Sequence, residues 1–291
     1  MNCRLAICQT NPKLGVVADN LQDHLQWLER CIEQDADVAL FPELSLTGYI
    51  LRDLTSEVGL TLDSPEIDEL VKRSVDISFA FGFVEHSRDH RFFNSTVFAE
   101  DGVIKHVHRK VHLPDYGIFE EGRYFASGNN FTTFDSKHGR FGFLICEDAW
   151  HLSSGWLHFL QGADALLIPV ASPSRGIETE TADLASQQSW RELCSSQAKF
   201  LQTWVVRCNR VGYEDGVLFD GESAINSPFG EVVAAAHHSD EDLIIHQLTS
   251  DILKRARVAT PLLRDAQAEV VRRQLAIISN DPDLAGIIDN A

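Results

Sequence analysis

The chain has 291 residues, of which 44% are hydrophobic and 23% charged, a composition typical of a globular protein with a sizeable core. Its net charge of -18 at pH 7 argues against nonspecific nucleic-acid binding and against adhesion to anionic membranes, because both need a basic surface. No apolar run reaches the roughly 18 residues that a membrane span needs.

Strands and helices alternate in the first half of the predicted fold. Arg4–Gln9 is a short strand, and apolar residues at helical spacing predict a helix over 20–34. The run Asp37–Phe41, which Pro42 ends, predicts a buried strand that leads into a loop. Further on we expect a helix over 67–74, a strand over 78–85, and a hairpin of strands 93–100 and 103–108 around Asp101-Gly102.

The second half continues in the same way. Asn226-Ser227-Pro228-Phe229-Gly230 is a turn signal, so the segments on either side of it predict a second hairpin. We expect strands over 141–146, 165–169, 203–209, 223–225, 231–235 and 243–247, and helices over 156–162, 186–200 and 267–278, with a loosely attached tail after about residue 280. Strands alternating with helices, with hairpins mixed in, predict an α/β fold with a mixed sheet covered by helices.

The six cysteines are scattered and form no CxxC pair, which argues against a zinc finger or a thioredoxin-like motif. The first residues contain neither the apolar core nor the cleavage site of a signal peptide. We found no internal repeat and no linker. These features predict a cytoplasmic protein with free thiols, folded as one continuous domain over residues 1–291.

Two polar residues follow apolar strands. Cys146 comes directly after Phe143-Leu144-Ile145, and strand ends are where an α/β sheet exposes reactive groups to a crevice. Free cysteines are also among the most buried residue types, so position alone leaves a core role open. Glu43 follows the strand that Pro42 ends, where a carboxylate suits a general base or an ordinary solvated loop residue.

Lys110 belongs to a run in which every second residue is basic or an imidazole. On a strand, His106, His108, Lys110 and His112 would share one face. Imidazoles two residues apart can bind one metal ion, but the lysine among them would repel a cation. An ordinary polar face is therefore favoured over a metal site. Glu121, next to Glu120, means little by itself.

The chain contains a glutamate, a lysine, a second glutamate and a cysteine in the order Glu43, Lys110, Glu121 and Cys146. With this order the sequence resembles the nitrilase superfamily of carbon–nitrogen hydrolases. The resemblance runs from about Leu5 to about Asp265. Its motifs are Phe41-Pro42-Glu43-Leu44 through Thr47-Gly48-Tyr49, Arg109-Lys110-Val111-His112-Leu113-Pro114, Glu121 through Tyr124-Phe125 to Gly128, Cys146-Glu147-Asp148, Asn209-Arg210-Val211-Gly212 and Asn226-Ser227-Pro228-Phe229-Gly230. The resemblance implies an α-β-β-α sandwich of two mixed sheets between helices.

Within the superfamily, the chain is most similar to the glutaminase domain of glutamine-dependent NAD synthetase. The similarity lies in 113–125, in Cys146-Glu147-Asp148-Ala149-Trp150 and in Ala171-Ser172-Pro173. Two features depart from that pattern. No Ser-Gly-Gly nucleotide loop of a synthetase half is present, and the early Arg175 is followed by acidic residues where the glutamine pocket has a basic one. The resemblance therefore leaves the amide substrate open.

The resemblance also implies a mechanism. Glu43 would accept the thiol proton of Cys146, and the thiolate would attack the amide carbon. Lys110, helped by a backbone N–H after Cys146, would stabilise the oxyanion, and Glu121 would orient Lys110. Water would then hydrolyse the thioester. No metal or organic cofactor is needed.

Four further residues are candidates for substrate contact: Tyr116, Glu147, Trp150 and Ser172. By resemblance, Glu147 would meet a cationic amino group, whereas packing alone could explain the two aromatic residues. The expected partner is a small-molecule amide. Members of the family usually associate, so the resemblance implies a homodimer or a higher homo-oligomer. A glutaminase that supplies ammonia to a separate synthetase, a nitrile hydrolase and a metal-binding protein remain alternatives.

Overall fold

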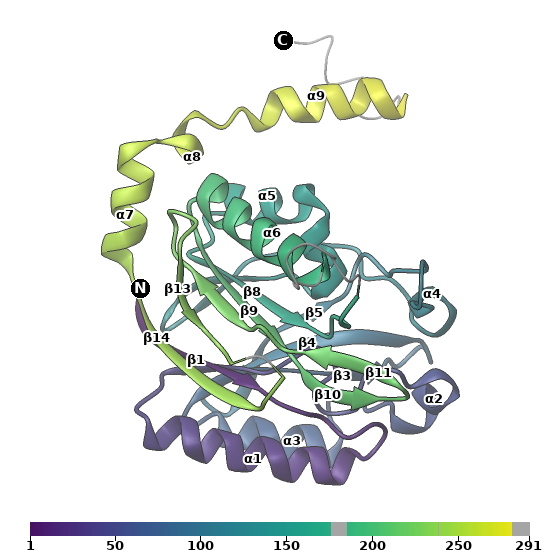
Figure 1. Cartoon of the computed structure of the whole chain (residues 1–291). Helices are drawn as coiled ribbons and strands as arrows, with labels where there is room; N and C mark the ends of the chain where they lie inside the picture. Colours follow the sequence, from purple (N-terminus) through teal and green to yellow (C-terminus); the bar gives the residue numbers. More distant parts are fainter. Residues whose placement is uncertain (176–184, 238, 281–291) are drawn as a thin grey trace.

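Two six-stranded sheets face each other, and helices cover their outer faces (Figure 1). This computed structural model describes residues 1–175, 185–237 and 239–280. The layers follow the order helix, sheet, sheet, helix, which confirms the predicted α-β-β-α sandwich.

The first sheet has the strand order β14-β1-β2-β3-β4-β5. Strands β1, β2 and β3 run parallel, and the other pairs are antiparallel, so the sheet is mixed. Asp101 and Gly102 both have positive φ in the turn between β4 and β5, as the predicted hairpin requires. The bounds are β1 Asn2–Gln9, β2 Val38–Leu40, β3 Ser78–His86, β4 Phe92–Glu100, β5 Val103–Arg109 and β14 Asp242–Thr249.

The second sheet has the order β13-β12-β9-β8-β7-β6, with β7, β8 and β9 parallel. A separate two-stranded ribbon pairs β10 with β11. The bounds are β6 Phe134–Ser136, β7 Gly139–Phe143, β8 Ala165–Val170, β9 Trp204–Asn209, β10 Val211–Glu214, β11 Val217–Asp220, β12 Ala224–Asn226 and β13 Val232–Ala235.

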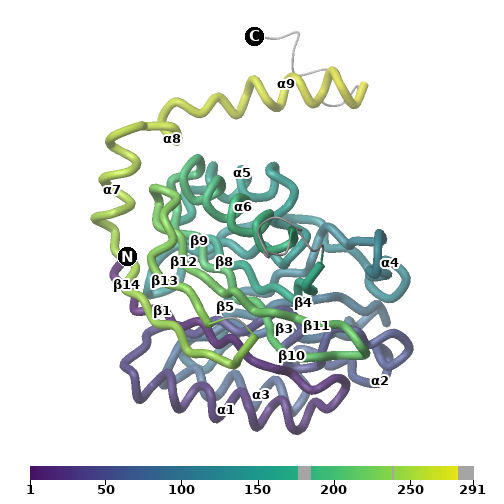
Figure 2. Tube along the Cα trace, in the orientation of Figure 1, coloured from purple at the N-terminus to yellow at the C-terminus, as the bar shows by residue number. Residues whose placement is uncertain are grey.

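Helices α1 and α3 lie against the outer face of the first sheet, and α5 and α6 cover the second (Figure 1). The chain then leaves the sandwich through α7 and α8, and α9 projects away from both sheets (Figure 2). The bounds are α1 Val17–Glu33, α2 Thr55–Val58, α3 Pro65–Arg73, α4 Glu121–Tyr124, α5 Leu152–Leu160, α6 Ala185–Leu201, α7 Ser250–Ala259, α8 Leu262–Asp265 and α9 Ala268–Ser279, with 3-10 turns at Arg52–Leu54 and Cys146–Trp150.

The central core lies between the two sheets, where inward-facing side chains of both meet. Leu5 and Phe98 from the first sheet pack in one cluster with Phe141 and Trp204 from the second. Separate apolar clusters fill the space between each sheet and its helices. Because strands of both sheets are buried on two faces, they appear in the sequence as continuous apolar runs.

The predicted elements are present, with shifted ends, but one strand was predicted too long. The run 141–146 leaves the sheet after Phe143, and Cys146 lies in a 3-10 turn. Leu144 and Ile145, which connect β7 to that turn, are apolar because they pack in one buried cluster with residues of α6. The ten-residue helix α7 and several shorter elements were not predicted, namely α2, α4, β6, β10, β11 and α8.

None of the helices in the described part of the chain is long and apolar enough to cross a membrane. The tail after about residue 280, which we expected to be loosely attached, lies outside the described residues.

Candidate active site

Glu43 lies in the loop that follows β2 and is 1% exposed. Its Oε1 accepts hydrogen bonds from Asn94 Nδ2 at 2.8 Å and from Lys110 Nζ at 2.7 Å. Its Oε2 accepts one from the backbone N–H of Ala171 at 2.8 Å. The loop passes so close to β3 that a Cβ on Gly82 would lie 2.4 Å from the backbone nitrogen of Leu44. The carboxylate is therefore fixed from three sides.

Lys110 follows β5 and is buried, at 1% exposure. Its ammonium donates to Glu43 Oε1 and to Glu121 Oε1, both at 2.7 Å. The backbone of Lys110 is held as well, because its N–H donates to the carbonyl of Asn94 and its carbonyl accepts from Gly128. One cation thus bridges two buried carboxylates.

Glu121 begins the short helix α4 and is 5% exposed. The hydroxyl of Tyr49 donates to its Oε1 at 2.5 Å, beside the bond from Lys110. Its Oε2 is buried and has no hydrogen-bond partner among the described residues.

Cys146 begins the 3-10 turn after β7, with a φ of 45° and 7% exposure. A positive φ is unusual for a residue with a side chain and marks a sharp change of chain direction at the strand end. The Asp148 carboxylate stabilises the turn, because Oδ2 accepts from the backbone of Ile145 at 3.1 Å and bonds to His108 Nε2 at 2.9 Å. Its Oδ1 accepts from the backbone N–H of Val111 at 3.1 Å, which ties the cysteine turn to the segment after Lys110.

Burial and mutual charge shape the ionisation of this cluster. Burial raises the pKa of Cys146, and the Glu43 carboxylate raises it further, while Lys110 opposes the shift. Burial disfavours the charge of Lys110, but Glu121 and Glu43 together outweigh it and raise its pKa well above the ordinary value. Burial raises the pKa of Glu121 to about 7 against the opposing effect of Lys110. Cys146 is therefore a thiol at rest that needs a base, and Lys110 stays charged.

The four residues expected to contact substrate flank this cluster. Glu147, next to Cys146, accepts a hydrogen bond at Oε2 from the hydroxyl of Tyr116 at 2.8 Å. Ser172 Oγ accepts from Trp190 Nε1 at 2.9 Å, and the ring of Trp150 stacks edge-on against Trp190 at 5.2 Å. Tyr116 and Trp150 are 53% and 41% exposed, so neither is a core residue.

A cavity of about 350 Å³ opens beside Glu121. Tyr49, Phe119 and Tyr124 are among the residues that line it. The guanidinium of Arg175 lies over the ring of Phe119, with its central carbon 4.5 Å from the ring centroid.

The three histidines considered as metal ligands do not converge on one point. His106 stacks on Phe134, with ring centroids 4.6 Å apart, while His108 bonds to Asp148. His112 lies beyond the end of β5 and stacks on His151 at 3.6 Å. Among the described residues, the one cluster of metal-ligating side chains lies elsewhere and contains none of these three. The three side chains therefore lie in separate environments, and the buried His108 is not part of a solvent-exposed polar face.

Three groups that contact the cluster have no role predicted from the sequence. Asn94 lies near the start of β4, and Ala171 contributes only its backbone N–H, so neither has a chemical signal in the sequence. Tyr49 belongs to the motif Thr47-Gly48-Tyr49, which carries part of the family resemblance. Its hydroxyl, next to a glycine turn, was the one feature of the sequence that could have indicated a polar contact in the site.

Comparison with protein families gives a match to the carbon–nitrogen hydrolase model over residues 4–257. The chain is 29% identical to the glutamine-dependent NAD(+) synthetase of Acinetobacter baylyi over 267 residues, which covers 92% of this chain and 48% of that protein. It is 25% identical to the N-carbamoylputrescine amidase of Arabidopsis thaliana, over 90% of this chain and 93% of the amidase.

Among solved structures, the glutamine-dependent NAD+ synthetase of Acinetobacter baumannii superposes with a TM-score of 0.77 at 30% identity. The match covers 87% of this chain and 47% of that one. The chain thus spans about half the length of the synthetases that it matches and nearly the full length of the amidase.

Proposed function

Because this chain belongs to the carbon–nitrogen hydrolase family, we propose that it cleaves the C–N bond of a small linear amide through a thioester on Cys146. The observation that carries the proposal is the buried ammonium of Lys110, held at 2.7 Å from both Glu43 and Glu121 and close enough to Cys146 to influence its ionisation. A cation, a base and a nucleophile in one buried cluster are the groups that acyl transfer needs.

In the proposed mechanism, Glu43 accepts the thiol proton of Cys146 as sulfur attacks the amide carbon. The developing oxyanion is stabilised by Lys110 and by a backbone N–H after the nucleophile, that of Glu147. Glu43 then passes the proton to the leaving ammonia or amine. The same carboxylate activates water, which hydrolyses the thioester and returns the thiol.

The other residues bind and orient. Glu121 accepts a second hydrogen bond from the Lys110 ammonium and so orients it, and Tyr49 fixes Glu121. Substrate would lie against Tyr116, Trp150 and Ser172, and its amino group would meet Glu147. The Glu147 carboxylate is partly exposed and already carries a hydrogen bond from Tyr116, so it is available to a cation without full desolvation.

The test is amide turnover by wild type and by Cys146→Ala. A panel of glutamine, ω-amides of dicarboxylates, carbamoyl amines, aliphatic amides and a nitrile would be assayed for ammonia release. We expect one class to be cleaved by wild type and by the control Cys194→Ala, which removes another buried thiol, and not by Cys146→Ala. Normal turnover by folded Cys146→Ala would show that the nucleophile is wrongly assigned.

A second candidate is a glutaminase that supplies ammonia to a separate synthetase. It is favoured by the similarity to glutamine-dependent NAD synthetases over about half of their length. Glutamine turnover that rises on addition of a synthetase partner would support it, whereas full activity of the isolated chain on another amide would exclude it as the main role.

We further propose that residues 1–291 form one domain that assembles as a homodimer or a higher homo-oligomer. The expectation comes from the family resemblance. Light scattering of the purified chain measures its mass directly, and a monomer at all concentrations would contradict it.

A further inference from the structure

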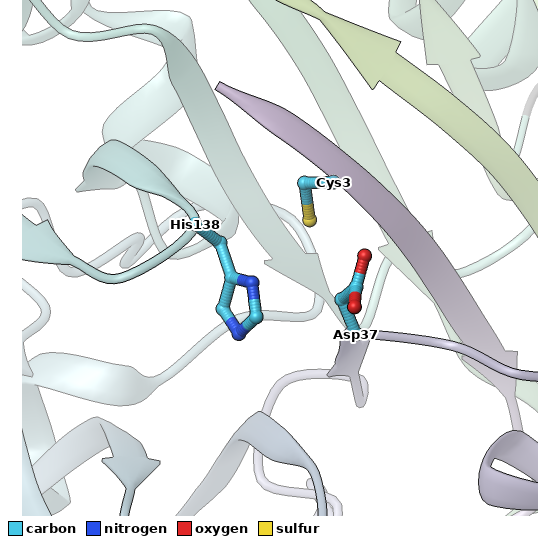
Figure 3. Close-up of side chains that lie close together, drawn as sticks. All are labelled: Cys3, Asp37 and His138. Carbon is cyan, nitrogen blue, oxygen red and sulfur yellow. The ribbon is translucent and has the colours of Figure 1, made fainter.

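A second group of reactive side chains lies at the end of the sandwich opposite the candidate active site. Cys3 comes near the start of β1, Asp37 directly precedes β2, and His138 lies in the turn between β6 and β7 (Figure 3). Glu43 follows β2, so the two clusters lie at opposite ends of that strand, roughly 20 Å apart by strand rise. The group joins both sheets, since the first two residues belong to one and His138 to the other.

The ligand atoms of these residues all lie within 4.8 Å of one another. A thiolate, an imidazole and a carboxylate are the ligand types of zinc sites, with bonds of about 2.0–2.3 Å, so small side-chain rotations would close them on one ion. We propose that Cys3, Asp37 and His138 form a zinc site that links the two sheets, with water as the fourth ligand.

Neighbouring residues hold the three side chains in place. The Oδ2 of Asp37 accepts the backbone N–H of Arg4 at 2.7 Å. The Nε2 of His138 bonds to Ser78 Oγ at 3.2 Å, which turns the other ring nitrogen toward Cys3 and Asp37 (Figure 3). A hydrogen bond on the second ring nitrogen is what orients metal-binding histidines.

The turn that carries His138 is itself anchored to the first sheet. Glu100 Oε2 accepts from Ser136 Oγ at 2.6 Å and from the backbone N–H of Lys137 at 3.2 Å. The Ser78 hydroxyl that contacts His138 also lies 3.4 Å from the same carboxylate oxygen. The imidazole is therefore positioned before any ion binds.

Charge also suits a divalent cation. Burial and the Asp37 carboxylate raise the pKa of Cys3, so its thiol is protonated without an ion. Burial lowers the pKa of His138, which keeps the imidazole neutral and able to coordinate. Binding of Zn²⁺ releases the Cys3 proton and leaves a thiolate and a carboxylate that together balance the two positive charges.

Competing arrangements fit these facts less well. Cys3 is fully buried, and its sulfur has no hydrogen bond to another described group. No second cysteine belongs to this cluster, so a disulfide is not an alternative there. The exposed acidic clusters that are common on protein surfaces do not include a buried thiol. The site does not touch the catalytic cluster, and the proposal stands whether or not the amidase assignment is right.

The test is stoichiometric binding of Zn²⁺ and of Co²⁺, whose thiolate charge-transfer and tetrahedral bands report the ligands. The chain should carry no histidine tag, and a C-terminal tag is preferable because Met1 packs beside Gly139. We expect wild type, Cys194→Ser and Cys146→Ala to bind the ion, and Cys3→Ser to lose the charge-transfer band. His138→Gln and Asp37→Asn keep the thiol but should bind far more weakly.

Thermal unfolding provides an independent measurement that does not depend on colour. The midpoint temperature of unfolding of wild type and of Cys194→Ser should rise as the concentration of free Zn²⁺ increases. The midpoint temperature of His138→Gln should stay unchanged. Loss of the cobalt band in Cys146→Ala alone would place the ion at the active site and overturn the proposal. Wild type that neither binds nor responds to zinc would overturn it as well.

Discussion

At the scale of single residues, the buried ammonium of Lys110 is the group on which the cluster depends. Glu43 and Glu121 share it, and both carboxylates are nearly inaccessible to water. Removing one partner from such a network leaves a buried charge without an opposite charge. The resulting loss in the free energy of unfolding is far larger than the net stability that the intact network contributes.

Lys110→Met should therefore impair both activity and stability. We expect a loss of about a hundredfold or more in kcat, the scale of a lost oxyanion partner, and a fall of about 3–5 kcal/mol in the free energy of unfolding. Lys105→Met, in the strand β5 that precedes Lys110, is the control, because Lys105 is 38% exposed and its partner Glu100 lies 3.6 Å away. Equal effects of the two changes would contradict a special role for Lys110.

Glu121 should give the stability of the chain a distinctive pH dependence. Its folded pKa of about 7 lies above the ordinary value of 4.5, so folding favours the protonated form. That contribution is complete below pH 4.5 and is lost as the pH rises through 7. At about 1.4 kcal/mol per pKa unit, the difference between 4.5 and about 7 corresponds to at most about 3–4 kcal/mol.

The measurement is denaturant unfolding of wild type and Glu121→Gln from pH 4.5 to 8. Wild type should lose stability relative to Glu121→Gln as the pH rises, because glutamine stays neutral throughout. Glu120→Gln, the exposed neighbour, should follow wild type. A difference that is constant across this range would show that Glu121 does not titrate there.

At the scale of elements, strand β3 sets the position of the loop that carries Glu43. Gly82→Ala keeps an ordinary strand conformation but places a methyl group against the backbone of Leu44. We expect a loss of about 1–3 kcal/mol in stability, and a lower kcat in the protein that remains folded. Melting and steady-state rates on the same preparation test this. An unchanged kcat would show that the loop adapts without moving Glu43.

The elements also show what the sequence could predict and what it could not. Apolar runs predicted β3 and β8 correctly, because strands buried on both faces have no polar alternation. The strand predicted through Cys146 failed because Leu144 and Ile145 stay buried after the backbone has left the sheet. A run of buried residues usually lies within a strand, but here the buried run continues for two residues after the strand ends.

The candidate site was predictable only in part for a related reason. Glu43, Lys110, Glu121 and Cys146 were identified by their order along the chain, and the structure brings the first three into direct contact, with Cys146 beside them. Asn94 and the backbone of Ala171 were not identified, because a single amide group on a strand has no pattern in the sequence.

At the scale of the whole molecule, the site exists only where the two sheets meet. Glu43 and Lys110 extend from strands of the first sheet, whereas Cys146 and Ala171 follow strands of the second. Neither sheet alone holds a complete set of groups. Any change that separates the layers should therefore abolish activity before the helices unfold.

The distribution of thiols has a practical consequence. All six cysteines are free and buried, but Cys146 is 7% exposed, whereas the others are exposed by 2% or less. Iodoacetamide reacts with the thiolate, which forms when Glu43 accepts the Cys146 proton. It should therefore alkylate a single thiol of the folded chain, in proportion to lost activity, and mass spectrometry should place the label on Cys146. Folded Cys146→Ala should stay unlabelled, and label elsewhere would contradict this. The incorporated label would then serve as an active-site titrant, which counts competent molecules in a preparation without knowledge of the natural substrate.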